Sequence, residues 1–64
     1  MFSVYDEVWY LDYEKVGHRA VVVDRSNGRY ELNILTVDGR VVPAVGVTLE
    51  SLRPFSCPLY PKVL

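Results

Sequence analysis

The sequence predicts a small, nearly all-β domain of 64 residues. Two turn signals, Asn27-Gly28 and Asp38-Gly39, lie between runs of β-branched and other apolar residues. Both dipeptides favour a type I′ hairpin turn, because each central residue of that turn needs a positive φ angle. The turns separate three segments, HRAVVVDR, RYELNILTV and RVVPAVGV, which we expect to form an antiparallel meander over residues 18–47.

Further elements flank this meander. The segment DEVWYLDY (residues 6–13) has the composition of a strand, and DYEKVGH (residues 12–18) is typical of a loop that leads into the meander. The segment TLESLRPF predicts a single 3₁₀ turn around residues 48–52, which Pro54 ends, followed by a short last strand. We therefore expect five strands, with one 3₁₀ turn before the last.

The alternation of side chains along a strand indicates which residues face the core. Tyr30, Leu32 and Ile34 share a face opposite polar neighbours, so we expect them to point inward. The same parity predicts a core of Val8, Tyr10, Ala20, Val22, Leu32, Ile34 and Leu52. In residues 20–23 and 41–47 neither parity is polar, which predicts apolar surface on both faces. Pro43 cannot donate a ladder hydrogen bond, so its strand is expected to run partly as an edge.

Composition restricts the classes of function. The net charge of −1 gives no general attraction to phosphate backbones. Cys57 is the only cysteine, which excludes an intramolecular disulfide and favours a reducing compartment, so we expect a cytoplasmic protein. No apolar run approaches the roughly 20 residues that a membrane helix needs, and the first residues lack the pattern of a signal peptide.

Three segments, YDEVWYLD, YELNILTVDG and LESLRPF, resemble parts of the SH3-like barrels of the Tudor and Agenet type and of retroelement integrase C-terminal domains. The resemblance covers about Tyr5 to Phe55. It implies an all-β, five-stranded, SH3-like (Tudor-like), partly open barrel over residues 1–57, followed by an apolar tail over 58–64. The resemblance supports the fold rather than any particular activity. The segment WYLDYE is similar to the opening of peptide-binding SH3 domains, whose aromatic groove takes proline-rich ligands.

A first candidate binding surface combines aromatic rings with carboxylates. Trp9, Tyr13, Asp12 and Glu14 lie within six residues of one another. Aromatic faces attract cations and nearby carboxylates add to that attraction, so this set predicts a site for a cationic or proline-rich segment. The competing interpretation is that about half of the aromatic residues belong to the core and the carboxylates are merely solvated. Apolar surface on two faces also favours binding to a protein partner or to copies of the chain itself.

A second candidate surface is basic. Arg25, Arg29 and Arg40 flank the two predicted turns, where they could contact a phosphate backbone as integrase C-terminal domains do. The alternative interpretation is that these arginines are ordinary solvated charges beside turns.

Catalytic and metal-binding patterns are weak. The one histidine, His18, is far along the chain from Cys57, and the pair is too small to hold a zinc ion. Asp12 and Glu14 fall in a segment expected to be exposed, where carboxylates keep ordinary pKa values. We therefore expect a protein that is not an enzyme and that holds no cofactor or metal.

Overall fold

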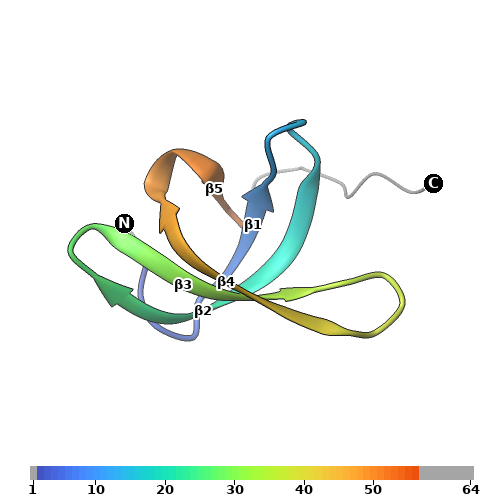
Figure 1. Cartoon of the computed structure of the whole chain (residues 1–64), viewed down its shortest axis with the longest axis horizontal. Coiled ribbons are helices and arrows are strands. Elements are labelled where there is room, and N and C mark those ends of the chain that lie inside the picture. The colour runs from blue at the N-terminus through green and yellow to red at the C-terminus, as the bar shows by residue number, and fades with distance from the viewer. Residues whose placement is uncertain (1, 57–64) are drawn as a thin grey trace.

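The computed structural model describes residues 2–56, which form one sheet of five antiparallel strands. The strands are β1 (Glu7–Leu11), β2 (Gly17–Ser26), β3 (Arg29–Leu35), β4 (Val41–Thr48) and β5 (Leu52–Pro54), and the 3₁₀ turn η1 (Leu49–Ser51) precedes β5 (Figure 1). Their order in the sheet is β4-β3-β2-β1-β5. The last strand therefore returns to pair with the first, and the five strands and the 3₁₀ turn agree with the prediction. The expected tail over 58–64 and Cys57 lie outside the described residues.

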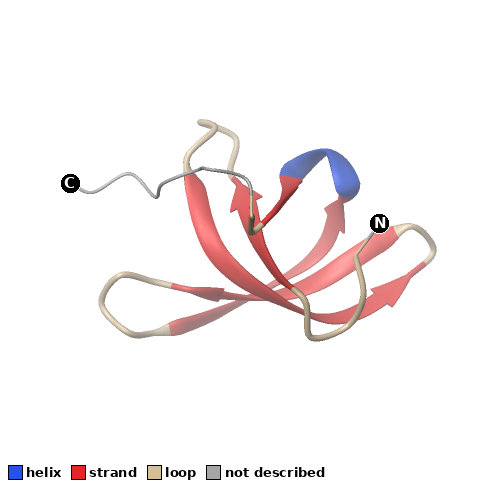
Figure 2. Ribbon diagram, turned by 180° about the vertical axis from the view of Figure 1, so that it is seen from behind, coloured by secondary structure: helices blue, strands red, loops and turns tan. Residues whose placement is uncertain are grey.

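The sheet is strongly curled but is not closed into a barrel. Strand β4 pairs with β3 and β5 pairs with β1, so β4 and β5 are its two edges. The turn η1 connects these edges, while the β3–β4 hairpin extends away from the rest of the molecule (Figures 1 and 2). Strand β5 has three residues, and its partner is β1. The edge position of Pro43 in β4 is confirmed.

The two turn signals have different outcomes. Asn27 and Gly28 have φ angles of 53° and 74°, which confirms the type I′ geometry. Gly39 has a φ of 86°, but Asp38 is not among the residues of positive φ, so type I′ is wrong for the β3–β4 turn. Here the Gly39 N–H donates to the carbonyl of Thr36 at 3.1 Å, and the Thr36 N–H donates to the carbonyl of Arg40 at 2.9 Å. This is a three-residue loop with Gly39 in the left-handed position.

Side-chain bonding of Thr36 explains the longer β3–β4 loop. The Arg40 N–H donates to Thr36 Oγ1 at 2.9 Å, and the Thr36 hydroxyl donates to the Asp38 carboxylate. These bonds favour pairing of Thr36 with Arg40, whereas a two-residue loop would pair Val37 with Arg40.

The β1–β2 connection is a tight hairpin rather than the longer loop expected over residues 12–18. Its backbone repeats the β3–β4 pattern: the Asp12 N–H donates to the Val16 carbonyl at 3.1 Å and the Lys15 N–H to the Asp12 carbonyl at 2.9 Å. Lys15 has a φ of 66°, so it occupies the left-handed position that Gly39 takes in the other turn. A lysine at that position gives no turn signal, so sequence patterns do not predict this hairpin.

Two irregularities bend the sheet. The β2–β3 register shifts between Val22 and Asp24, and the β3–β4 register shifts between Tyr30 and Leu32. Gly46, in the second irregular region, has a φ of 68°. Bulges of this kind increase the local twist and bend the strand that carries the extra residue. The extra residues lie on β2 and β4, so these two strands bend around the core.

The core lies on the inner face of the curled sheet. Its buried members are Val8, Ala20, Val22, Tyr30, Leu32, Val47 and Leu52, and Tyr10 and Ile34 pack against them partly buried. The inward orientation of Tyr30, Leu32 and Ile34 is therefore confirmed. Within residues 2–56 there is no helix of the length and apolarity that a bilayer crossing requires.

Candidate interaction surfaces

Trp9 points to the outer face of the sheet, whereas its neighbour in β1, Val8, points into the core on the inner face. The Trp9 side chain is nevertheless only 6% exposed. The ring of Phe55, which follows β5, stacks on Trp9 with 5.0 Å between centroids and 21° between planes. The predicted aromatic platform is thus largely covered by a ring of the same chain.

A cation of the same chain already lies at this aromatic pair. The Arg19 guanidinium carbon is 5.5 Å from the centroid of the Phe55 ring. The register pairs Trp9 with Arg19 on one side and with Arg53 on the other, so both arginines flank the tryptophan on one face. Two hydrogen bonds orient the Arg53 side chain: its Nη1 donates to the carbonyls of Glu50 at 2.9 Å and Leu52 at 2.8 Å.

The same row of side chains continues across the sheet with apolar residues. Arg19 pairs with Leu35, and Leu35 pairs with Val41, both of which are exposed. We call Arg53, Trp9, Arg19, Leu35 and Val41 the outer row. It is cationic and aromatic over β5, β1 and β2, and aliphatic over β3 and β4.

Asp12 has a structural role in the β1–β2 turn. Its Oδ1 accepts the N–H of Glu14 at 2.8 Å and that of Val16 at 3.0 Å, and its Oδ2 lies 2.9 Å from Nε2 of His18. The hydrogen bond with His18, followed by the Val16 N–H, lowers the pKa of Asp12. Both carboxylate oxygens are therefore engaged within the turn.

Tyr13 and Glu14 lie at the exposed tip of that turn, and the Tyr13 side chain is 91% exposed. Of the four residues expected to form an aromatic and acidic surface, the structure thus brings Asp12, Tyr13 and Glu14 together in one turn. Trp9 lies in the middle of β1 beneath Phe55.

The three arginines of the basic surface lie at two ends of the sheet. Arg25 and Arg29 flank the β2–β3 turn, whereas Arg40 follows the β3–β4 turn at the other end of β3 (Figure 1). Each is bonded within the chain: Arg25 to the Phe2 carbonyl at 3.1 Å, Arg29 to the Gly46 carbonyl at 3.1 Å, and Arg40 to the Asp38 carboxylate at 2.9 Å.

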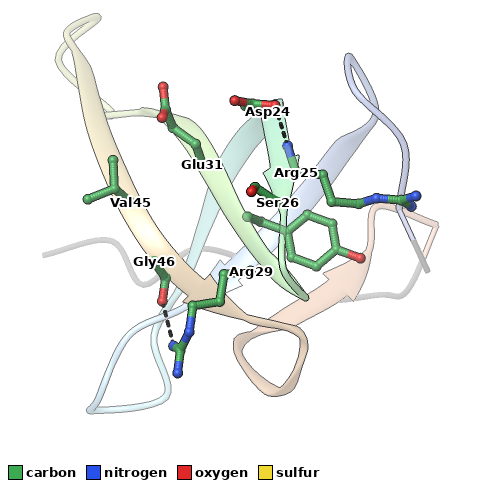
Figure 3. A pocket seen from close by; sticks show the side chains of 8 residues that line it. Asp24, Arg25, Ser26, Arg29, Glu31, Val45 and Gly46 are labelled. Atoms are coloured by element: carbon green, nitrogen blue, oxygen red, sulfur yellow. Dashed lines mark hydrogen bonds between the residues drawn. The ribbon is translucent and has the colours of Figure 1, made fainter.

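Two shallow hollows adjoin the β2–β3 turn. One, of about 120 Å³, is lined by Arg25, Arg29, Asp24 and Glu31 among others, so its cations are balanced by carboxylates. In Figure 3 the Arg25 and Arg29 side chains point in different directions from this hollow. The second, of about 410 Å³, includes Arg25, Tyr30 and Leu49 in its lining. Neither hollow brings the guanidinium groups of Arg25 and Arg29 together.

The β3–β4 hairpin carries the largest group of exposed aliphatic side chains among the described residues. They are Leu35, Val37, Val41, Val42 and Val45, and we call this set the apolar hairpin. Val42 pairs with Ile34 and so shares the inner face of the sheet, whereas Leu35 and Val41 belong to the outer face. The hairpin is therefore apolar on both sides.

No protein-family model, curated protein or solved structure matches this chain. In residues 2–56 no group of three or more His, Cys, Asp or Glu side chains is placed to hold a metal ion. Sequence reasoning did not place Arg19, Arg53 or Phe55 beside Trp9. Only the strand register reveals them, because three segments far apart in sequence bring them to Trp9.

Proposed function

We propose that this chain is a non-enzymatic interaction module that associates with copies of itself through the apolar hairpin. The observation that carries the proposal is the exposure of this hairpin, where Val37 is 87% and Val45 is 73% exposed. Exposed aliphatic side chains gathered on one hairpin are more typical of an interaction surface than of a monomer in water. Burial of apolar area is the main driving force of association.

The charge pattern favours a second copy as the partner. Strand β4 has no charged residue between Val41 and Thr48. Two copies can therefore place these strands together without opposing like charges, as a symmetric interface requires.

Pro43 indicates which kind of contact the hairpin makes. Hydrogen-bonded and non-hydrogen-bonded pairs alternate along an antiparallel ladder. Since Thr36 and Arg40 are bonded, Pro43 opposite Asn33 is at a non-bonded position, and its nitrogen faces the open edge without a hydrogen to donate. The edge is thus poorly suited to adding another strand, and contact through side chains is favoured.

The arrangement of the strands also supports an SH3-like fold, in line with the resemblance of the sequence. Four consecutive strands form a meander, and a single 3₁₀ turn leads to a short fifth strand beside the first. SH3-like domains have this order of elements, and many of them are binding modules.

Light scattering over a range of protein concentrations tests self-association. The wild type is expected to form a dimer or higher oligomer, and the double variant Val37→Lys with Val45→Lys to remain monomeric. Both positions are well exposed, so the fold should survive the change. Tyr13→Lys is the matched control, because Tyr13 is equally exposed at the tip of another hairpin. A wild type that stays monomeric at every concentration overturns the proposal.

Nucleic-acid binding is the second candidate, and the location of Arg25 and Arg29 on either side of one tight turn favours it. The expected ligand is single-stranded, and its phosphates would contact these two arginines. Titration with a thymidine oligonucleotide at low salt tests it. Binding that the double variant Arg25→Glu with Arg29→Glu abolishes, and that Arg40→Glu leaves unchanged, would support this candidate over the first.

A further inference from the structure

The outer row combines two kinds of surface side by side. At one end, Arg53 and Arg19 flank Trp9, and at the other, Leu35 and Val41 are exposed aliphatic residues. Neighbouring strands are about 4.8 Å apart, so a row across five strands extends roughly 20 Å. This length suits a short extended peptide lying across the strands.

Arg19 is positioned to receive an anion. Its guanidinium is held near the ring of Phe55, yet its side chain is 55% exposed. Arg19 forms a long ion pair with Glu7, in which Glu7 Oε2 lies 3.9 Å from Arg19 Nη2, beyond hydrogen-bond distance. The N–H groups of a guanidinium lie in its own plane, where a carboxylate can accept two of them.

We propose that the outer row binds an acidic, aliphatic segment of another protein. Carboxylates of the segment pair with Arg19 and Arg53, and its aliphatic side chains pack on Leu35 and Val41. This inference builds on the proposed function only in treating the chain as an interaction module. The binding surface is different from the tip of the apolar hairpin, although Leu35 and Val41 belong to both sets.

The proposed ligand has the opposite charge to the one that the aromatic and acidic sequence pattern predicts. That pattern indicates a cationic ligand on Trp9. In the structure the aromatic pair is already covered by a cation of the chain, Arg19, and Asp12 is engaged in its own turn. A foreign cation at this position would meet the Arg19 guanidinium, whereas a carboxylate would complement it.

The same face is poorly suited to nucleic acid. Phe55 is the exposed ring of the pair, at 37%, and the Arg19 guanidinium lies beside it where a base would have to stack. Leu35 and Val41 make no favourable contact with phosphate groups, whereas aliphatic side chains of a peptide can pack against them.

Selection from a random peptide library displayed on phage tests the ligand class without presuming a sequence. The immobilised full chain is expected to enrich peptides that combine Asp or Glu with Leu, Ile or Val. The variant Arg19→Glu should not enrich them, whereas Lys15→Glu, a charge reversal at the exposed β1–β2 turn, should. Enrichment of basic or proline-rich peptides, or equal enrichment by Arg19→Glu, overturns the proposal.

Affinity measurements complete the test, because Trp9 is the only tryptophan and lies within the row. An enriched peptide should change Trp9 fluorescence, and Arg19→Gln and Arg53→Gln should each weaken its binding about tenfold or more. A thymidine oligonucleotide that binds the wild type but not Arg19→Gln would overturn the proposal in favour of nucleic acid. The variant with Val37→Lys and Val45→Lys should still bind the peptide, so failure of self-association and failure of peptide binding are separate results.

Discussion

Asp12 and His18 form a link across the β1–β2 turn, with 2.9 Å between Asp12 Oδ2 and His18 Nε2. The other oxygen of Asp12 accepts two backbone N–H groups of the same turn. One carboxylate therefore closes a hairpin whose backbone lacks a glycine at its left-handed position. The ionised Asp12 carboxylate has three hydrogen-bond partners, and a protonated carboxyl group would bind them more weakly. The stability of the turn therefore depends on pH.

Acid should destabilise the protein through this carboxylate. The pKa of Asp12 is lowered from its ordinary value of 3.8, so the folded state holds the proton less tightly than the unfolded state does. The contribution of Asp12 is complete above that ordinary value and is lost as the pH falls through the lowered pKa. Urea unfolding at a series of acidic pH values should show this loss.

The variant Asp12→Asn serves as the comparison for the acid prediction. It should be less stable than the wild type at neutral pH, and its stability should depend less on pH in the acid range. Some dependence should remain, because Thr36 and Arg40 also lower the pKa of Asp38. Equal acid dependence of the two proteins would contradict the prediction.

Gly28 and Gly39 should both resist substitution. Each has a positive φ, 74° and 86° respectively, and a Cβ at either position would meet no atom within 4 Å, so the cost of alanine is conformational rather than a clash with neighbours. We expect Gly28→Ala and Gly39→Ala each to lower the free energy of unfolding by about 1 kcal/mol. Denaturant unfolding of the two variants measures this. Unchanged midpoints would show that the turns relax to other conformations at no cost.

Lys15 and Gly39 occupy equivalent positions in two hairpins of the same type, with φ angles of 66° and 86°. Left-handed conformation costs a lysine roughly 1 kcal/mol more than a glycine. Lys15→Gly should therefore stabilise the protein by up to about 1 kcal/mol, and Gly39→Lys should destabilise it by a similar amount. Thermal unfolding of the two variants should move in opposite directions. Destabilisation by Lys15→Gly would mean that the Lys15 side chain itself contributes to the turn.

The core should be most sensitive at Leu32. Its side chain is fully buried, between Val22 on β2 and Ala44 on β4 in the register. Leu32→Ala should cost about 2–5 kcal/mol, which a domain of this size can hardly tolerate. Ile34 is only partly buried at the edge of the core, so Ile34→Ala should cost less. Equal losses in chemical unfolding would contradict the gradient of burial along β3.

Most of the sheet can be predicted from the sequence, because its signals are local. Alternation determines the inner face of β3, and Asn27-Gly28 determines one hairpin, because both signals are local. The β1–β2 hairpin is not predictable in this way, since the side chain of Asp12 replaces the usual glycine signal. Nor is the Trp9–Phe55 stack, which depends on the return of β5 to β1. The pairing of β5 with β1 also determines which charged residues lie near Trp9. The charge of the expected ligand therefore depends on a contact between strands that cannot be recognised in the sequence.

Removing Phe55 should expose Trp9. The two rings are stacked at 5.0 Å, and Phe55 is the more exposed partner, so Phe55→Ala removes the outer ring while leaving the inner-face core intact. Trp9 emission should shift to longer wavelength, and acrylamide should quench it more readily. Phe55→Leu is the matched control, because it keeps apolar cover over Trp9 but removes the ring, and its shift should be smaller. If Phe55→Ala leaves the emission and quenching of Trp9 unchanged, Phe55 is not what shields the tryptophan in solution.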